Sequence, residues 1–191
     1  MGKTRLEAFS DGVIAILITI MVLELKLPPG PDLASLRSIL PTMLMYLLSF
    51  VFLGIYWNNH HHMLHATERV DGTMLWANLH LLFWLSLVPF TTRWMGESHF
   101  AALPTSTYGV VLLCAALAYT ILQGRIIALQ GRDSKLARAV GNDAKGYASI
   151  AAYLLAIPLA FVTPWISGAL YVTVAMIWLI PDRRIERVLD H

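Results

Sequence analysis

Five stretches of the chain are dominated by apolar residues and carry few or no charges. They span residues 5–25, 38–59, 72–92, 100–124 and 146–181. A helix needs about 20 apolar residues to cross a bilayer, so each of the first four stretches predicts one membrane span. The fifth contains 36 uncharged residues, and one helix of that length would reach about 54 Å, far beyond a hydrocarbon core of about 30 Å. Because proline disfavours helix in the residue before it, we divide this stretch into two spans near Thr163 and Pro164.

Composition supports a membrane protein. Hydrophobic residues make up 57% of the chain and charged residues only 14%, whereas a soluble domain is about half apolar and a quarter charged. The chain is therefore predicted to be an all-α membrane protein, a single domain of residues 1–191 with six transmembrane helices. The first stretch does not resemble a signal peptide, because Asp11 and Glu24 interrupt its apolar run.

Lysine and arginine are distributed unequally between the two sides of these six spans. The side of the amino terminus holds eleven of them, Lys3, Arg5, Arg69, Arg125, Arg132, Lys135, Arg138, Lys145, Arg183, Arg184 and Arg187. The opposite side holds three, Lys26, Arg37 and Arg93. Since cytoplasmic loops carry the excess of positive charge, both termini are predicted to be cytoplasmic.

The first span is unusual because it carries acidic residues. Glu7, Asp11 and Glu24 belong to it, and only twelve uncharged residues separate the last two. Charged side chains within a bilayer face protein or water, since contact with lipid is costly. We therefore expect the other five helices to shield this helix from lipid.

One face of the first span is apolar apart from a single hydroxyl. At 100° per residue, this face covers about 120° of the helix and contains Phe9, Gly12, Ile16, Thr19, Ile20, Leu23 and Leu27. Asp11 points about 140° away from Ile16. The residues alone leave two interpretations open, because such a stripe either packs against another helix or lines a pore, and packing is the commoner case.

Residues 58–65, "NNHHHMLH", invite a metal-binding interpretation. His61 and His65 are four residues apart, a spacing that can hold zinc on a helix, but no HExxH motif or nearby cysteine accompanies them. We therefore expect no metal site and no cofactor, and we interpret these side chains as interfacial histidines, with pH sensing as an alternative. Asn78 and His80 lie inside the third span, where polar side chains usually pair within the helix bundle.

The residues Arg5, Phe9, Ser10 and Asp11 form the pattern R-x-x-x-F-S-D at the start of the first span. This pattern, together with six predicted spans, closely resembles the potassium channels of endosomes and lysosomes, the transmembrane-protein-175 family. The animal members have two six-helix repeats and form dimers, whereas the bacterial members have one repeat and form tetramers. The single motif in this chain resembles the bacterial type.

The resemblance implies a role for each part of the first span. The first helix of every subunit would line a central pore, with Ile16, Ile20 and Leu23 as the constriction and gate and with Thr19 as the candidate selectivity element. The motif residues Arg5, Phe9, Ser10 and Asp11 would anchor the helix. Candidate partners for the motif are polar residues near the cytoplasmic ends of the second and third spans, namely Asn58, His60, His61, Asn78 and His80.

The resemblance thus implies a homotetrameric cation channel that is permeable to potassium and modestly selective for it over sodium. It would lie in the cytoplasmic membrane among lipids and conduct potassium and other monovalent cations, without a nucleic-acid partner. A secondary ion transporter or proton-coupled carrier is the alternative, because acidic residues within spans and broken helices are typical of that class, and Pro158 and Pro164 could mark a broken helix. A membrane enzyme using residues 60–62 is disfavoured, because no nucleophile or metal set accompanies these histidines.

Overall fold

The computed structural model describes residues 2–131, 133–141 and 143–179, and within these ranges the secondary structure is entirely helical. The helices are α1 (Lys3–Leu23), α2 (Leu33–Ser38), α3 (Leu40–His65), α4 (Gly72–Ser86), α5 (Val88–Glu97), α6 (Ala102–Gln130), α7 (Lys135–Val140), α8 (Ala144–Leu159) and α9 (Pro164–Leu179). Four helical segments, α1, α3, α4 with α5, and α6, are long and apolar enough to cross a membrane. The helices α8 and α9 are apolar but shorter.

Local sequence signals explain several of the helix boundaries. The carboxylates of Asp32, Asp71 and Asp143 accept hydrogen bonds from backbone N–H groups in the first turns of α2, α4 and α8, which satisfies donors that a helix start leaves free. The helix α6 ends at Gly131, whose φ of 93° suits glycine. The short helix α2 begins directly after a segment with three prolines and a glycine, residues 28–31, and the Asp32 cap stabilises its start.

Two prolines in the apolar segments have different effects. Pro89 follows the interruption at Leu87 that separates α4 from α5, because proline lacks an N–H and its ring clashes with the carbonyl four residues earlier. Pro158 instead lies inside α8, one residue before that helix ends. The division of the last apolar stretch falls where the sequence predicts it, since α9 begins at Pro164.

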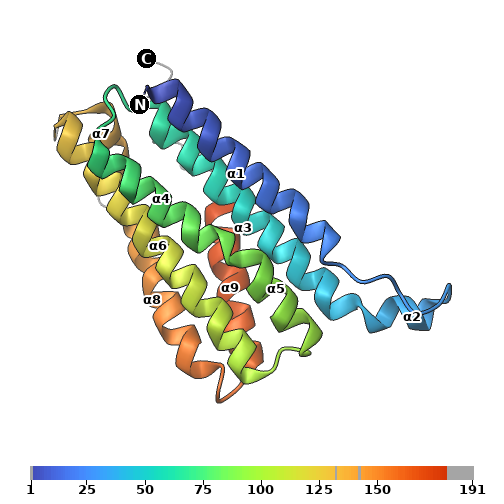
Figure 1. Cartoon of the computed structure of the whole chain (residues 1–191). Helices are drawn as coiled ribbons and strands as arrows, with labels where there is room; N and C mark the ends of the chain where they lie inside the picture. Colours follow the sequence, from blue (N-terminus) through green and yellow to red (C-terminus); the bar gives the residue numbers. More distant parts are fainter. Residues whose placement is uncertain (1, 132, 142, 180–191) are drawn as a thin grey trace.

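The long helices run alternately in opposite directions (Figure 1). In this arrangement α1 lies at the edge of the bundle and contacts α3, α4 and, more weakly, α5. The expectation that the other five helices of the same chain shield α1 is therefore wrong. One face of α1 packs against its own chain, and the opposite face is left uncovered.

Two apolar cores hold the bundle together. The first contains the buried face of α1, including Leu6, Ile14 and Leu17, with residues of α3, α4 and α6. The second joins parts of α3, α5, α6, α8 and α9, where α6 and α9 approach closely at Gly109 and Tyr171.

Four of the positive charges used for the topology prediction, Arg132, Arg183, Arg184 and Arg187, lie outside the described residues.

Candidate pore-lining face and its anchors

The apolar stripe predicted on the first span lies on the uncovered face of α1. The exposed fractions of its side chains include 56% for Ile16, 40% for Ile20 and 80% for Leu23. The residues that α1 buries against its own chain lie on the opposite face, and they are Leu6, Ser10, Ile14, Leu17 and Met21. The chain therefore presents Ile16, Ile20 and Leu23 away from its own bundle.

Thr19 lies on the same exposed face, one turn after Ile16. Its hydroxyl donates a hydrogen bond of 2.9 Å to the carbonyl oxygen of Ile16. A threonine hydroxyl has one proton and two lone pairs. Because the proton is used within the helix, the lone pairs of this exposed hydroxyl remain available to accept, which is the polarity that a cation requires.

Ser10 connects α1 to two other helices through a buried hydrogen-bonded chain. The side-chain N–H of Asn78 in α4 donates to the Ser10 hydroxyl at 2.9 Å. The Oδ1 atom of Asn78 lies 2.7 Å from Nε2 of His60 in α3. All three side chains are fully buried, so the chain joins α1, α4 and α3 where water does not compete for the hydrogen bonds.

Asp11 is held by a different residue of α3. The indole Nε1–H of Trp57 donates a hydrogen bond of 3.1 Å to Oδ1 of Asp11. Sequence reasoning missed this partner, because a tryptophan near the end of a span is first interpreted as part of an interfacial aromatic belt. The useful signal is that an indole N–H is a donor that needs an acceptor when it is partly buried.

The remaining motif residues and candidate partners have other surroundings. Arg5 and Phe9 are exposed, and Arg5 makes no ion pair within the part of the chain that the structure describes. His80 accepts a hydrogen bond of 2.9 Å from the Trp84 indole in its own helix. His61 stacks beside Trp57 and His65 in α3, and Asn58 is exposed on the same helix.

Charged side chains connect both ends of α1 to neighbouring helices. Beyond its carboxyl-terminal end, Glu24 pairs with Arg93 of α5, which also contacts Glu97 at 3.1 Å. Glu97 in turn pairs with Lys26 at 2.9 Å. At the other end, the ammonium of Lys3 donates a hydrogen bond of 2.6 Å to the carbonyl of residue 65 at the end of α3. Sequence reasoning counted Arg93 only as one of the positive charges between spans and missed its pairing with Glu24.

The histidines of α3 lie in different environments. Among the residues that the structure describes, no three histidine, cysteine, aspartate or glutamate side chains are placed to hold a metal ion. His60 is directed into the buried chain with Asn78, whereas His61 and His65 are exposed. The cluster "NNHHHMLH" is thus divided between the bundle interior and its surface.

Comparisons with known proteins agree on one family. The sequence model described as endosomal/lysosomal potassium channel TMEM175 matches residues 5–89. A potassium channel of a Chryseobacterium species is 57% identical over 99% of this chain and 98% of its own length. A potassium channel of Chamaesiphon minutus is 32% identical over 85% of this chain and 86% of its own length. The crystal structure of a lysosomal potassium-selective channel TMEM175 homolog from Chamaesiphon minutus superposes with a TM-score of 0.84 at 29% identity, covering 94% of this chain and 97% of that one.

Proposed function

Since this chain belongs to the TMEM175 potassium channel family, we propose that it forms a potassium-permeable cation channel in the cytoplasmic membrane of a bacterium. It is a multi-pass membrane protein, and the family is one of channels and not of enzymes. In the proposed channel six helical segments cross the membrane, both termini are cytoplasmic and four copies surround one pore. The alternating directions of the helices support this topology.

The observation that carries this proposal is the uncovered apolar face of α1. Ile16, Ile20 and Leu23 are exposed in the single chain, although the opposite face of the same helix packs into a core. Four copies of α1 around an axis would turn these side chains inward as stacked rings. Rings of bulky apolar side chains expel water when they are narrow, and dewetting of this kind closes a pore.

Thr19 is the proposed selectivity element between two of these rings. Four Thr19 oxygens, one from each subunit, would replace part of the water shell of a permeating ion. A hydroxyl ring supplies fewer oxygens than stacked backbone carbonyls do, so the preference for potassium over sodium is modest. The hydrogen bond from Thr19 to the Ile16 carbonyl supports this role, because it leaves the lone pairs available.

The motif residues serve the pore by fixing α1 against α3 and α4. The contacts of Ser10 and Asp11 support this function. Without them a helix that is packed on only one side would be free to rotate, and its pore-lining face would lose its orientation. The exposed Arg5 and Phe9 are proposed to complete the anchoring at the contact with a neighbouring subunit.

The test is flux of potassium and sodium from proteoliposomes that contain the purified wild-type protein, Ile16→Asn or Val22→Asn. A polar ring at Ile16 admits water, so this variant is expected to increase potassium flux at least about tenfold. Val22 is also exposed on α1 but lies about 120° away from Ile16 around the helix, and its variant is the matched control. Equal flux from Ile16→Asn and the wild type would refute a constriction at this residue.

The same assay separates a channel from a carrier and tests Thr19. Flux through a channel follows the ion gradient without coupling, whereas a secondary transporter or proton-coupled carrier saturates and moves its ions in a fixed ratio. Thr19→Val preserves the shape of the side chain and removes the oxygen, so the potassium/sodium permeability ratio is expected to fall toward one. An unchanged ratio would exclude Thr19 from the selectivity element.

A further inference from the structure

A long apolar groove lies between α3 and α9, which are neighbours in the bundle (Figure 1). Its volume is about 530 Å³, and its walls are residues 44–51 of α3 and 164–179 of α9, together with Met95 and Phe100. Fifteen described residues line it, and their side chains are apolar apart from the indole N–H of Trp165. The groove therefore offers a surface for hydrocarbon and almost no hydrogen bonds.

Small residues of α9 keep this groove open. A methyl group added at Gly168 would meet no atom within 4 Å, so the space beside this glycine holds no side chain of the same subunit. Ala169 and Ala175 line the groove with nothing larger than a methyl group. On the α3 wall, Leu44 and Leu47 are exposed. The described residues of this chain therefore leave the groove unfilled.

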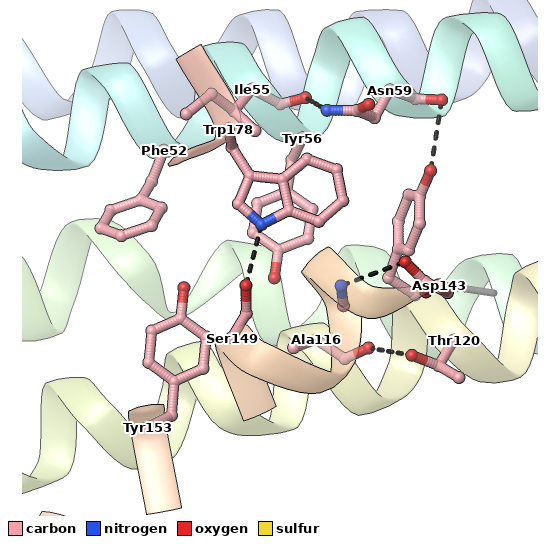
Figure 2. Close-up of a pocket in the computed structure, with 12 residues that line it drawn as sticks. Phe52, Ile55, Tyr56, Asn59, Ala116, Thr120, Asp143, Ser149, Tyr153 and Trp178 are labelled. Atoms are coloured by element: carbon pink, nitrogen blue, oxygen red, sulfur yellow. Dashed lines mark hydrogen bonds between the residues drawn. The ribbon is translucent and has the colours of Figure 1, made fainter. Parts of the chain in front are cut away.

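A second space beside α9 has a different character. Figure 2 shows this cavity, which is lined in part by Trp178, whose indole N–H donates to the Ser149 hydroxyl at 2.9 Å. Its volume of about 40 Å³ has room for about three water molecules, since one needs about 10–15 Å³. The hydroxyl of Tyr153 is turned toward it (Figure 2). This cavity suits water, whereas the larger apolar groove suits a hydrocarbon chain.

The length of the groove fits one extended acyl chain. The lining residues of α9 run from Pro164 to Leu179, which is about 22 Å of helix at 1.5 Å per residue. The hydrocarbon core of a bilayer is about 30 Å thick, so one leaflet measures about 15 Å. A long chain that enters at one end of the groove can therefore stay in contact with it past the middle of the bilayer.

Aromatic side chains mark the end of the groove at which α9 begins. Trp165 is 70% exposed, and its ring lies 5.2 Å from that of Phe100, measured between centroids. Tryptophan is enriched at the membrane–water interface, where one part of its ring system is apolar and the N–H is polar. The polar part of a lipid is therefore expected at this end, with its chain directed toward Leu179.

The groove lies on the side of α3 that is turned away from α1. Tyr46 of α3 approaches Met21 of α1, since both line one small gap. At 100° per residue, Leu44, Leu48 and Val51 point about 140–160° away from Tyr46, and no residue of α1 lines the groove. With α1 innermost in the tetramer, the groove lies at the perimeter of the channel and meets lipid, not a neighbouring subunit.

From these observations we propose that the groove binds one acyl chain of a membrane phospholipid. An apolar space of this kind stays dry, and unfilled walls lose their dispersion contacts. Acyl chains are the apolar molecules available within a bilayer, and a chain between two helices has protein on both sides. The inference goes beyond ion conduction, and it rests on the proposed function only in placing the groove at the perimeter.

The test is native mass spectrometry of the wild-type protein, Gly168→Leu and Gly124→Leu, each reconstituted with dipalmitoylphosphatidylglycerol and then washed in detergent. The wild type is expected to retain one phospholipid per subunit. Gly168→Leu places a side chain in the groove, so retained lipid should fall at least about tenfold. An added methyl group at Gly124 also meets no atom within 4 Å, but Gly124 lies on α6 outside the groove, and its variant should retain lipid as the wild type does.

Two further lipids separate recognition of the chain from recognition of the headgroup, using the wild-type protein alone. Dipalmitoylphosphatidylethanolamine has the same chains and another headgroup, so its retention should equal that of the first lipid. Didecanoylphosphatidylglycerol keeps the headgroup but has chains too short to fill the groove, and its retention should be at least about tenfold lower. Retention that follows the headgroup and ignores the chain length would refute the proposal.

The remaining outcomes are equally decisive. Washed wild-type protein without bound phospholipid, or unchanged retention by Gly168→Leu, would overturn the acyl-chain site. Dissociation of the wild-type oligomer by Gly168→Leu would assign the groove to a contact between subunits and would also refute the proposal. Because the readout is lipid mass and not ion flux, protein that conducts potassium without retaining lipid would refute this inference and leave the proposed channel intact.

Discussion

Replacing Asn78 with leucine tests whether the buried chain between α1, α3 and α4 holds the first helix in place. Leucine has a similar volume, so the change removes polarity with little loss of packing. It deletes two hydrogen bonds, one to Ser10 at 2.9 Å and one to His60 at 2.7 Å. Both partners are then left buried without the group that satisfies them.

The expected loss follows from the burial and the number of bonds. Interhelical hydrogen bonds in membrane proteins contribute about 0.6 kcal/mol on average and about 1.7 kcal/mol at most. A buried polar group that loses its partner adds a penalty of about 1–3 kcal/mol. For two bonds among side chains that are fully buried, we expect Asn78→Leu to lower the free energy of unfolding by about 2–3 kcal/mol.

Reversible unfolding in mixed micelles, followed by far-ultraviolet circular dichroism, measures this loss. Asn58→Leu is the matched control, because Asn58 is exposed, and its change is expected to stay within about 0.5 kcal/mol. A double-mutant cycle with Ser10→Ala isolates the bond between Ser10 and Asn78, and its coupling energy should be about 0.6–1.7 kcal/mol. Wild-type stability of Asn78→Leu, or a coupling energy of zero, would refute the anchoring argument.

Three further predictions concern packing, pH and the outer ion pairs. Gly109→Ala places a methyl group 2.2 Å from the Tyr171 hydroxyl, whereas Gly124→Ala meets nothing within 4 Å, so the first should lower the thermal midpoint and the second should raise or preserve it. The pKa of Asp71 is lowered by its hydrogen bond from the N–H of residue 74. The ionised carboxylate therefore contributes its full stabilisation at pH values above the ordinary pKa of 3.8, and this stabilisation is lost as pH falls through the lowered pKa. In Asp71→Asn the thermal midpoint should fall less steeply with acid than in the wild type. Arg93→Gln separates two partly exposed glutamates from their shared partner. As for a surface ion pair, we expect it to lower the free energy of unfolding by no more than about 1 kcal/mol, and by less at high salt. A larger loss, or one that high salt does not reduce, would contradict this expectation.

The sequence by itself determined the class of the protein, most of its helices and the composition of the proposed pore face. The hydrophobic stretches predicted these segments because a bilayer requires long apolar helices whose backbone groups are satisfied internally. Helical periodicity also grouped Ile16 with Ile20 on one face, because the positions of side chains around a helix are fixed by its 100° steps. The motif at Ser10 and Asp11 then identified the family.

Only the tertiary structure decided which partners these residues have and which face of α1 is uncovered. Periodicity states which side chains share a face, but not what lies opposite that face, since this depends on how segments distant in sequence pack. His60, Asn78 and Trp57 became partners of the motif in this way, whereas His61 and His80, of the same residue type as His60, did not. The close approach of α6 and α9 at Gly109 and Tyr171 likewise depends on contacts between helices, whereas the break at Leu87 has a local cause in Pro89.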